Sequence, residues 1–357
     1  MPLLSQIEIQ DYRLFKRLHF DGLTRVNLIV GRNNSGKTAL LEAVEAVVSE
    51  RSPFAFYRSS VERGETLANR ISRNVDGVLI EVKRWFRGHT LAPGTTIRIS
   101  AVATRPLLFT RSVAEVPREP FPQPPFVPGG FRIETNRAGV PPDASTILPL
   151  IPGGFLGAPP ARDFVDHGTT LSPPVCFITT KRQTATDLQP LWSRVVLTPE
   201  EEEVNTALRC VDASIKRVAL SGTAEDAVGV VLLDSAREPV PIGSLGEGTA
   251  RMLSIALNLA VSKGGYLIAD EIDTGLHYSV MVDMWRLVIR TARRLDVQVF
   301  ATTHSLDCVN ALGWLAENDA DLAADISLHR LERGYDRTTA YTADEIADAA
   351  RHHGELR

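Results

Sequence analysis

Residues 27–38 read Asn27-Leu28-Ile29-Val30-Gly31-Arg32-Asn33-Asn34-Ser35-Gly36-Lys37-Thr38, and the architecture of this chain of 357 residues can be worked out from them. The first four are an apolar run that ends on a glycine, which is the pattern of a short buried strand. From Lys37 onward apolar residues recur with the period of a helix. They are Ala39, Leu40, Leu41, Ala43, Val44, Val47 and Val48. The stretch therefore predicts a strand, a glycine loop and a helix in direct succession.

The glycine loop, residues 31–38, matches the pattern G-x-x-x-x-G-K-[ST] in full and has the strand-to-helix context that the pattern requires. Glycines let successive backbone N–H groups curl around a phosphate at a helix N-terminus, where the helix dipole favours anions. We expect Lys37 to bridge the β- and γ-phosphates of a nucleotide and Thr38 to offer its hydroxyl to Mg²⁺. The other predicted nucleotide contacts are Gly31, Arg32, Asn33, Asn34, Ser35 and Gly36. Because the loop reads phosphates and not the base, it does not distinguish ATP from GTP.

Two adjacent carboxylates follow a second apolar run, residues 265–269. Because neighbouring residues on a strand face opposite sides, Asp270 is expected to face Mg²⁺ and Glu271 to polarise the attacking water. General-base help of this kind is worth about 10² to 10⁴ in rate.

A third apolar run, residues 297–302, ends at Thr303-His304-Ser305. His304 is thus expected at the carboxyl end of a strand, where ligands of open α/β sheets bind. An imidazole there can contact the γ-phosphate and report whether it is present. The predicted catalytic residues are Glu271, His304 and Lys37, and the predicted metal ligands are Thr38 and Asp270.

These motifs, in this order, resemble the ABC-type ATPases outside transporters, the group that includes SMC and RecF proteins and the overcoming-lysogenization-defect (OLD) family. Small bacterial AAA/OLD-like ATP-binding proteins look most similar. In that family's terms GRNNSGKT is the Walker A motif, LIADE is Walker B with Glu271 as the catalytic base, and ATTHS is the switch-histidine motif. The resemblance covers residues 1–50 and 175–357 and implies an ATPase that uses ATP and Mg²⁺. It also implies an α/β ABC-type P-loop NTPase head, with a mainly parallel sheet flanked by helices and an N-terminal antiparallel β-subdomain.

Residues 244–249, Ser-Leu-Gly-Glu-Gly-Thr, stand just before Walker B, where the ABC signature LSGGQ falls. In the family this loop binds the γ-phosphate of the nucleotide held by the opposite subunit, so the resemblance implies a homodimer closed through nucleotide. Here Gly246 replaces the signature serine, Glu247 replaces its first glycine, and Gly248 is kept. The contacts implied for this loop are Ser244, Gly246, Gly248 and Thr249.

Other positions depart from the family's pattern. His277 stands where transporters carry an aspartate that crosses the dimer interface, which favours the OLD-like group. A Q-loop glutamine cannot be placed, because none follows Walker A before Gln123. We expect no TOPRIM nuclease, since about fifty residues without its acidic cluster follow the histidine motif, and no SMC-type coiled coil, since no extended heptad stretch exists.

The predicted organisation has three parts. Residues 1–105 form the N-terminal part of the head with Walker A, beginning with two antiparallel strands in residues 6–20. Residues 106–174 hold 15 of the 22 prolines and are expected to form an extended, loop-rich insertion. Residues 175–357 complete the head, with a strand at 175–179 and a helix that Thr198 caps and Pro199 begins.

The amino-acid composition excludes fewer classes of function than the motifs do. The net charge of −4 does not indicate a nucleic-acid binder, and no apolar run approaches the length of a membrane span, so we expect a cytoplasmic protein. Three scattered cysteines support neither disulfides nor zinc and are expected to be buried. The stretch Lys83-Arg84-Trp85-Phe86-Arg87 fits either a platform for single-stranded nucleic acid or an edge strand, and His352-His353 fits a solvated tail better than a metal site.

Three functions fit these observations. The leading one is a molecular switch in which ATP closes a homodimer, hydrolysis opens it, and the motion controls a protein effector, in a phage-defence or DNA-maintenance setting taken from family analogy. A DNA-repair or DNA-processing ATPase acting directly on DNA is the second. The third is a nucleotide-sensing scaffold with little turnover.

Overall fold

The structure is a computed structural model. It describes residues 4–49, 52–72, 75–92, 94–103, 109–115, 130–137, 146–149, 155–158, 173–223, 226–352 and 356. The chain divides into two compact units. Unit 1 comprises Met1–Leu23, Asn34–Ser172 and Glu332–Thr338, and unit 2 comprises Thr24–Asn33, Pro173–Leu331 and Thr339–Arg357.

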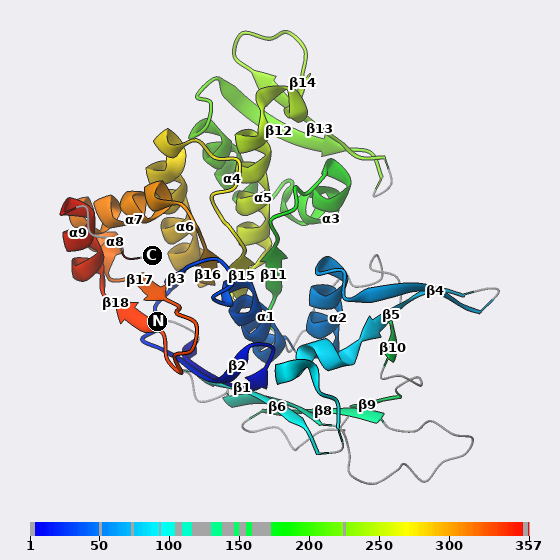
Figure 1. Cartoon of the computed structure of the whole chain (residues 1–357). Coiled ribbons are helices and arrows are strands. Elements are labelled where there is room, and N and C mark those ends of the chain that lie inside the picture. The colour runs from blue at the N-terminus through cyan, green and yellow to red at the C-terminus, as the bar shows by residue number, and fades with distance from the viewer. Residues whose placement is uncertain are drawn as a thin grey trace. The chain divides into compact units, whose positions relative to one another are not determined.

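Unit 2 is organised around a six-stranded sheet with the order β11-β15-β16-β3-β17-β18 (Figure 1). Its strands are β3 (Val26–Val30), β11 (Val175–Ile178), β15 (Tyr266–Ala269), β16 (Gln298–Thr302), β17 (Ile326–Arg330) and β18 (Thr339–Tyr341). All neighbours pair in parallel except β17 with β18. Every residue of β3, β15 and β16 is buried, as expected for parallel strands covered on both faces. The predicted mainly parallel sheet and the strands after residues 26 and 174 are confirmed.

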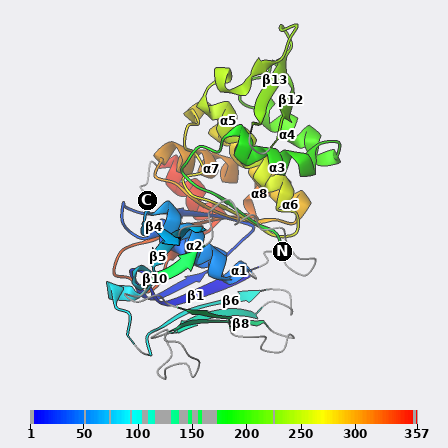
Figure 2. The ribbon, with the colours of Figure 1, turned by 90° about the vertical axis from the view of Figure 1, so that its right-hand side faces the viewer.

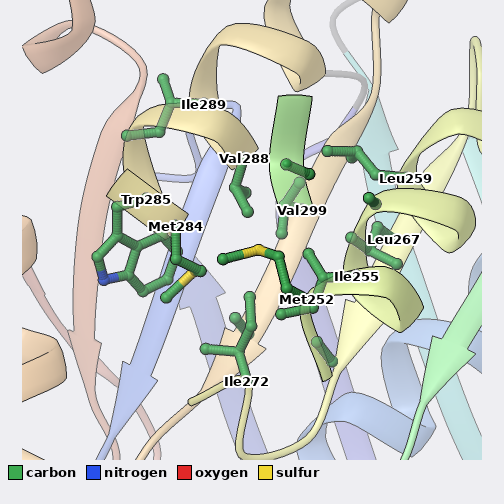
Figure 3. Packing of buried hydrophobic residues seen from close by; sticks show 14 of the residues in the cluster. Met252, Ile255, Leu259, Leu267, Ile272, Met284, Trp285, Val288, Ile289 and Val299 are labelled. Atoms are coloured by element: carbon green, nitrogen blue, oxygen red, sulfur yellow. The ribbon is translucent and has the colours of Figure 1, made fainter. Parts of the chain in front are cut away.

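Helices pack around this sheet and supply most of the core of unit 2. They are α3 (Ala185–Val195), α4 (Pro199–Arg209), α5 (Glu247–Val261), α6 (Met281–Leu295), α7 (Leu306–Asn318), α8 (Ala320–Ala323) and α9 (Ala343–Arg351). Figure 3 shows Met252 and Ile255 of α5 and Met284 and Val288 of α6 meeting the strand residue Val299. Apolar burial against the sheet therefore fixes the position of α5 relative to β15 and β16.

A small antiparallel sheet completes unit 2. It consists of β12 (Ile215–Ser221), β13 (Val228–Leu233) and β14 (Val240–Pro241), and Figures 1 and 2 show β12 and β13 beside α3, α4 and α5, away from the central sheet. The helix expected from Thr198-Pro199 is α4, with proline in its first turn. The expected cap is wrong in detail, because the Thr198 hydroxyl donates to the Val195 carbonyl at 2.5 Å and makes no capping bond.

Unit 1 contains the predicted N-terminal antiparallel sheet. Its order is β2-β1-β6-β7-β8-β9, from β1 (Leu4–Tyr12), β2 (Phe15–Asp21), β6 (Thr96–Ala103), β7 (Phe109–Glu115), β8 (Gly130–Arg137) and β9 (Thr146–Pro149). A second sheet holds β4 (Thr66–Ser72), β5 (Val75–Glu81) and β10 (Phe155–Ala158). Figures 1 and 2 show α1 (Lys37–Val48) and α2 (Ser52–Glu62) on one side of the larger sheet.

The stretch 106–174 is less loop-rich than its prolines suggest. Among its described residues β7, β8 and β9 extend the sheet begun by β1 and β6, and β10 pairs with β5. The remaining expectation of extended loops falls largely on residues outside the described ones.

No helix in the described part of the chain is long and apolar enough to cross a membrane. Of the three cysteines, Cys308 is buried as expected, whereas Cys176 and Cys210 are only half-buried.

Candidate active site

The two carboxylates expected after the second apolar run lie at the carboxyl edge of the unit 2 sheet. The register pairs Ala269 of β15 with Ala301 of β16, so Asp270 lies beside Thr302. The Thr302 hydroxyl donates to Asp270 Oδ1 at 2.5 Å and accepts from the backbone N–H of Glu271 at 2.8 Å. One buried hydroxyl thus fixes the Asp270 side chain and the Glu271 backbone together.

Glu271 does not follow the alternation of a strand. Strand β15 ends at Ala269, and Glu271 has a φ of 47°, in the left-handed region that residues with a Cβ seldom adopt. The direction of its side chain therefore comes from this turn, which corrects the expectation based on strand pleating. The Thr274 hydroxyl donates to Glu271 Oε2 at 3.3 Å, so the carboxylate has a partner that orients it.

His304 faces the same carboxylate. Its Nε2 lies 3.7 Å from Glu271 Oε1, and both side chains are about 40 % exposed. This separation is that of an ion pair when the imidazole is protonated and is too long for a direct hydrogen bond. Both neighbours of His304 are anchored: Thr303 donates to Asp273 Oδ1 at 2.7 Å, and the Ser305 hydroxyl caps α7. The histidine is thus held at the sheet edge while its ring remains accessible.

The phosphate loop links the two units, since Gly31–Asn33 belong to unit 2 and Asn34–Thr38 to unit 1. Strand β3, which precedes it, ends at the same sheet edge as β15 and β16. Arg32, Asn33 and Asn34 are exposed, whereas Ser35 and Lys37 are buried.

The residues of this loop fit a phosphate ligand. The buried Ser35 hydroxyl has no hydrogen-bond partner among the described residues. Helix α1 has neither a side-chain cap nor an acid in its first turn, so nothing within that turn neutralises the positive end of its dipole. Gly36 has a φ of 107°, and a Cβ there would lie 2.8 Å from Phe15 Cζ. An anion with several oxygens matches these unfilled donors.

The signature-like loop lies at the start of α5. Gly246, with a φ of 91°, is the residue before the helix, and Gly248 packs so closely that a Cβ would lie 3.2 Å from the Gly275 carbonyl. The Ser244 hydroxyl donates to the Pro241 carbonyl at 2.7 Å, and the buried Thr249 hydroxyl donates to the Leu245 carbonyl at 3.2 Å. Both hydroxyls therefore serve the loop itself.

Glu247, which replaces the first glycine of the signature, is exposed in the first turn of α5. Its side chain packs on Gly275, where a Cβ would lie 2.8 Å from Glu247 Cγ. An acid at this position complements the helix dipole and so weakens the attraction of the helix end for a further anion.

Two further positions bear on the family pattern. Gln183 follows β11, but its side-chain oxygen accepts from Ser254 at 2.5 Å and from Asn258 at 3.0 Å, both on α5. It therefore joins the β11 loop to α5, and the Q-loop contact stays unassigned.

His277 is exposed and its ring lies 4.2 Å from that of Tyr278, which is 64 % exposed.

The weaker sequence signals do not form sites. Residues 82–85 form a short 3-10 helix, not an edge strand, and Trp85 and Phe86 are buried, so neither ring is available to stack on a base. Lys83 and Arg84 pair with Glu81. His352 contacts Asp348 at 3.3 Å, and His353 lies outside the described residues.

No group of three or more metal-ligating His, Cys, Asp or Glu side chains occurs in the part of the chain that the structure describes. Mg²⁺ does not require such a group, because it is usually held by one or two carboxylates and substrate phosphates. The carboxylate of Asp270 and the hydroxyl of Thr38 are oxygen donors of the kind it prefers.

Sequence reasoning missed Thr302, Thr303 and Thr274, which hold Asp270, Asp273 and Glu271. In the sequence, Thr302 and Thr303 stand out only as two hydroxyl residues directly before His304. Their partners stand about thirty positions earlier, so the contacts depend on the parallel pairing of β15 with β16.

Comparison with known proteins supports ATPase chemistry for this chain and identifies its fold. The family model described as "AAA ATPase domain" matches residues 3–101, and the model described as "AAA domain, putative AbiEii toxin, Type IV TA system" matches residues 185–309. The crystal structure of an SMC head bound to the C-winged helix domain of ScpA matches with a TM-score of 0.54 at 11 % identity, over 96 % of this chain and 98 % of that one. The chain thus has the SMC/ABC-type ATPase-head fold, as predicted.

Two proteins are similar to this chain in sequence, one over most of its length and the other over a short part. An "ATP/GTP phosphatase" of Helicobacter pylori is 23 % identical over 354 residues, 87 % of each chain. An uncharacterized protein of Methanocaldococcus jannaschii is 35 % identical over 68 residues, 19 % of this chain and 60 % of that one. The two family models and the phosphatase relative support ATP hydrolysis by this chain, and the predicted ATPase activity is confirmed.

Replacing Thr302 by valine keeps the shape of the side chain but leaves the Glu271 N–H without its acceptor and Asp270 without its donor. We expect kcat to fall about 10- to 100-fold and the Mg²⁺ concentration for half-maximal turnover to rise. Thr302→Ser, which keeps the hydroxyl, is the matched control. Steady-state ATP hydrolysis at varied Mg²⁺ checks this, and equal turnover of the two variants would show that the hydroxyl does not position the site.

Replacing Gly36 by alanine should weaken ATP binding by about tenfold or more, since the added Cβ displaces the start of α1, where backbone N–H groups meet the phosphates. Gly264→Ala is the control, because Gly264 also has a positive φ but a Cβ added there would meet nothing within 4 Å. Both changes incur similar backbone strain, about 1–3 kcal/mol. Calorimetric titration with Mg-ATP measures the affinities, and unchanged binding by Gly36→Ala contradicts the expectation.

Proposed function

We propose that this ATPase is a molecular switch in which ATP closes a homodimer and hydrolysis opens it. The observation that carries the proposal is the cluster of Asp270, Glu271 and His304 at one sheet edge, with Thr302 binding both carboxylate residues. A carboxylate and an imidazole 3.7 Å apart can share the tasks of activating water and sensing the γ-phosphate. The order of the motifs along the chain supports a single nucleotide site of this kind.

In this proposal each residue has a defined task. Glu271 accepts a proton from the attacking water, and Thr274 keeps its carboxylate oriented. His304 contacts the γ-phosphate oxygens, and Lys37 spans the β- and γ-phosphates. Mg²⁺, when bound by Thr38 and Asp270, neutralises the charge of the phosphate oxygens.

Closure of a homodimer would use the signature-like loop. The exposed Gly246 and the half-buried Gly248 place backbone at the start of α5, where a phosphate of the second copy's nucleotide could be bound. Because the Ser244 hydroxyl is engaged and Glu247 occupies the first turn, we expect trans-binding weaker than a complete LSGGQ loop would give. Dimer closure should therefore need ATP that persists unhydrolysed.

The proposed output is control of a protein effector, in the manner of the OLD-like group and in a phage-defence setting. The description of the second family model, which names an AbiEii toxin and a Type IV TA system, supports such a setting. The name of the Helicobacter pylori relative includes GTP, so we extend the proposal to hydrolysis of either nucleotide.

Direct action on DNA has no comparable support. The aromatic rings near Lys83 are buried. The arginines of α6 form a row on its exposed side, but each pairs with an acid. They are Arg286, Arg290, Arg293 and Arg294. Neither the segment around Lys83 nor the arginine row of α6 therefore offers the unpaired basic surface that DNA binding requires.

The switch predicts that Glu271→Gln, which keeps the shape of the side chain but removes the base, slows ATP turnover by about 10²-fold or more. The mass of this variant in solution should double in Mg-ATP and return to that of one chain without nucleotide. Lys37→Ala is the control, because loss of the phosphate contact should leave it a monomer in both conditions. Light scattering coupled to size exclusion measures the mass of both variants and of the unchanged protein.

A Glu271→Gln protein that stays monomeric in saturating Mg-ATP would contradict the closed dimer. Turnover by the unchanged protein, with ATP or GTP and with or without double-stranded DNA, is measured in parallel. Stimulation by DNA would favour the DNA-processing alternative.

A further inference from the structure

Arg251 is a buried cation with four hydrogen bonds, all to backbone carbonyls of the turn around Glu271 and of the neighbouring loop. It belongs to α5 and is 7 % exposed. Its Nε donates to the Ile272 carbonyl at 3.2 Å, and its Nη1 to the Thr179 carbonyl at 2.9 Å. Its Nη2 donates to the Asp270 carbonyl at 3.0 Å and to the Glu271 carbonyl at 2.6 Å. A single guanidinium thus joins three consecutive carbonyls of the Asp270–Ile272 turn to the loop after β11.

The charge of Arg251 is not used in an ion pair with any described residue. Burial lowers the pKa of Arg251, whereas the negative charges of Asp273, Asp270 and Glu271 raise it. A buried cation is costly unless it is well hydrogen-bonded, and here the compensation comes from carbonyl oxygens and nearby acids. The hydrogen bonds of Arg251 therefore serve to hold the backbone of the Asp270–Ile272 turn.

The backbone that Arg251 holds includes the left-handed residue Glu271. A residue with a Cβ persists at a φ of 47° only where its surroundings impose that conformation. The Glu271 N–H is held by the Thr302 hydroxyl at 2.8 Å, and its carbonyl is held by Arg251 at 2.6 Å. The two contacts fix opposite ends of the residue, and so they fix the direction in which its Cα–Cβ bond leaves the backbone.

We propose that Arg251 is a positioning residue for ATP hydrolysis, which keeps the Glu271 carboxylate in its productive orientation by holding the Asp270–Ile272 turn. The inference rests on the proposed role of Glu271 as the general base. Arg251 acts through the backbone of this turn. Lysine cannot replace it, because one ammonium group cannot reach four carbonyls that a planar fork spans.

Arg251→Lys tests this directly, since it keeps the charge and much of the volume. We expect kcat to fall about 10- to 100-fold while the KM for ATP changes by less than about threefold, because the phosphate loop supplies the ground-state contacts. Guanidinium ion at millimolar concentration should restore part of the turnover of Arg251→Ala and none of that of Arg251→Lys, whose side chain fills the site.

Arg209→Lys is the matched control. Arg209 also donates to backbone carbonyls, those of Ile215 at 3.1 Å and Lys216 at 2.9 Å, but it lies on α4 and contacts no residue of the Asp270–Ile272 turn. The Arg209→Lys variant should retain the kcat of the unchanged protein, whatever the effect of the change on thermal stability.

Equal kcat for Arg251→Lys and Arg209→Lys would overturn the inference, as would a raised KM with unchanged kcat. If Arg251→Ala does not fold, the comparison of the two lysine variants still decides. Glu271→Gln separates the two proposals: if it abolishes turnover while Arg251→Lys is fully active, only the role of Arg251 fails, and if Glu271→Gln is itself active, both fail.

Discussion

The backbone of Glu271 is held from both ends, and the chemistry that we propose for this ATPase depends on that constraint. The Thr302 hydroxyl accepts from its N–H, the Arg251 guanidinium donates to its carbonyl, and between them the residue adopts a left-handed conformation. Such a conformation costs about 1–3 kcal/mol, which is stored where the surroundings over-determine it. The carboxylate therefore has a direction that no regular strand or helix would give it.

Both holding residues owe their places to the packing of unit 2. Parallel pairing of β15 with β16 brings Thr302 beside Asp270, and the same strand end carries His304. Burial of Met252 and Ile255 against the sheet fixes α5, the helix that carries Arg251 (Figure 3). Gln183 adds a polar tie between α5 and the loop after β11, so the helix cannot shift without disturbing that loop. A site that must stay within fractions of an ångström thus rests on rigid elements.

Much of the fold could be predicted from the sequence because its signals are local. The apolar runs before Gly31 and Asp270 predicted buried strands, and the alternation around Tyr12 predicted antiparallel ones. Strand β8 was missed because the surrounding prolines masked the alternation of Phe131 and Ile133 with polar residues. In the site, local motifs indicated Asp270 and Glu271, whereas their contacts with Thr302 span more than thirty positions and depend on sheet register. The roles assigned to the motif residues remain predictions.

The central claim, that the backbone of one residue is held by two side chains acting together, is tested most directly by a double-mutant cycle on kcat. Thr302→Val and Arg251→Lys are measured alone and combined, in saturating Mg-ATP. If both side chains hold Glu271, the loss of either contact already removes most of the gain in kcat that its fixed orientation provides. The double variant should then be little slower than the slower single variant. If the logarithms of the two losses instead add in full, the side chains act independently, and the account of a shared constraint on Glu271 is contradicted.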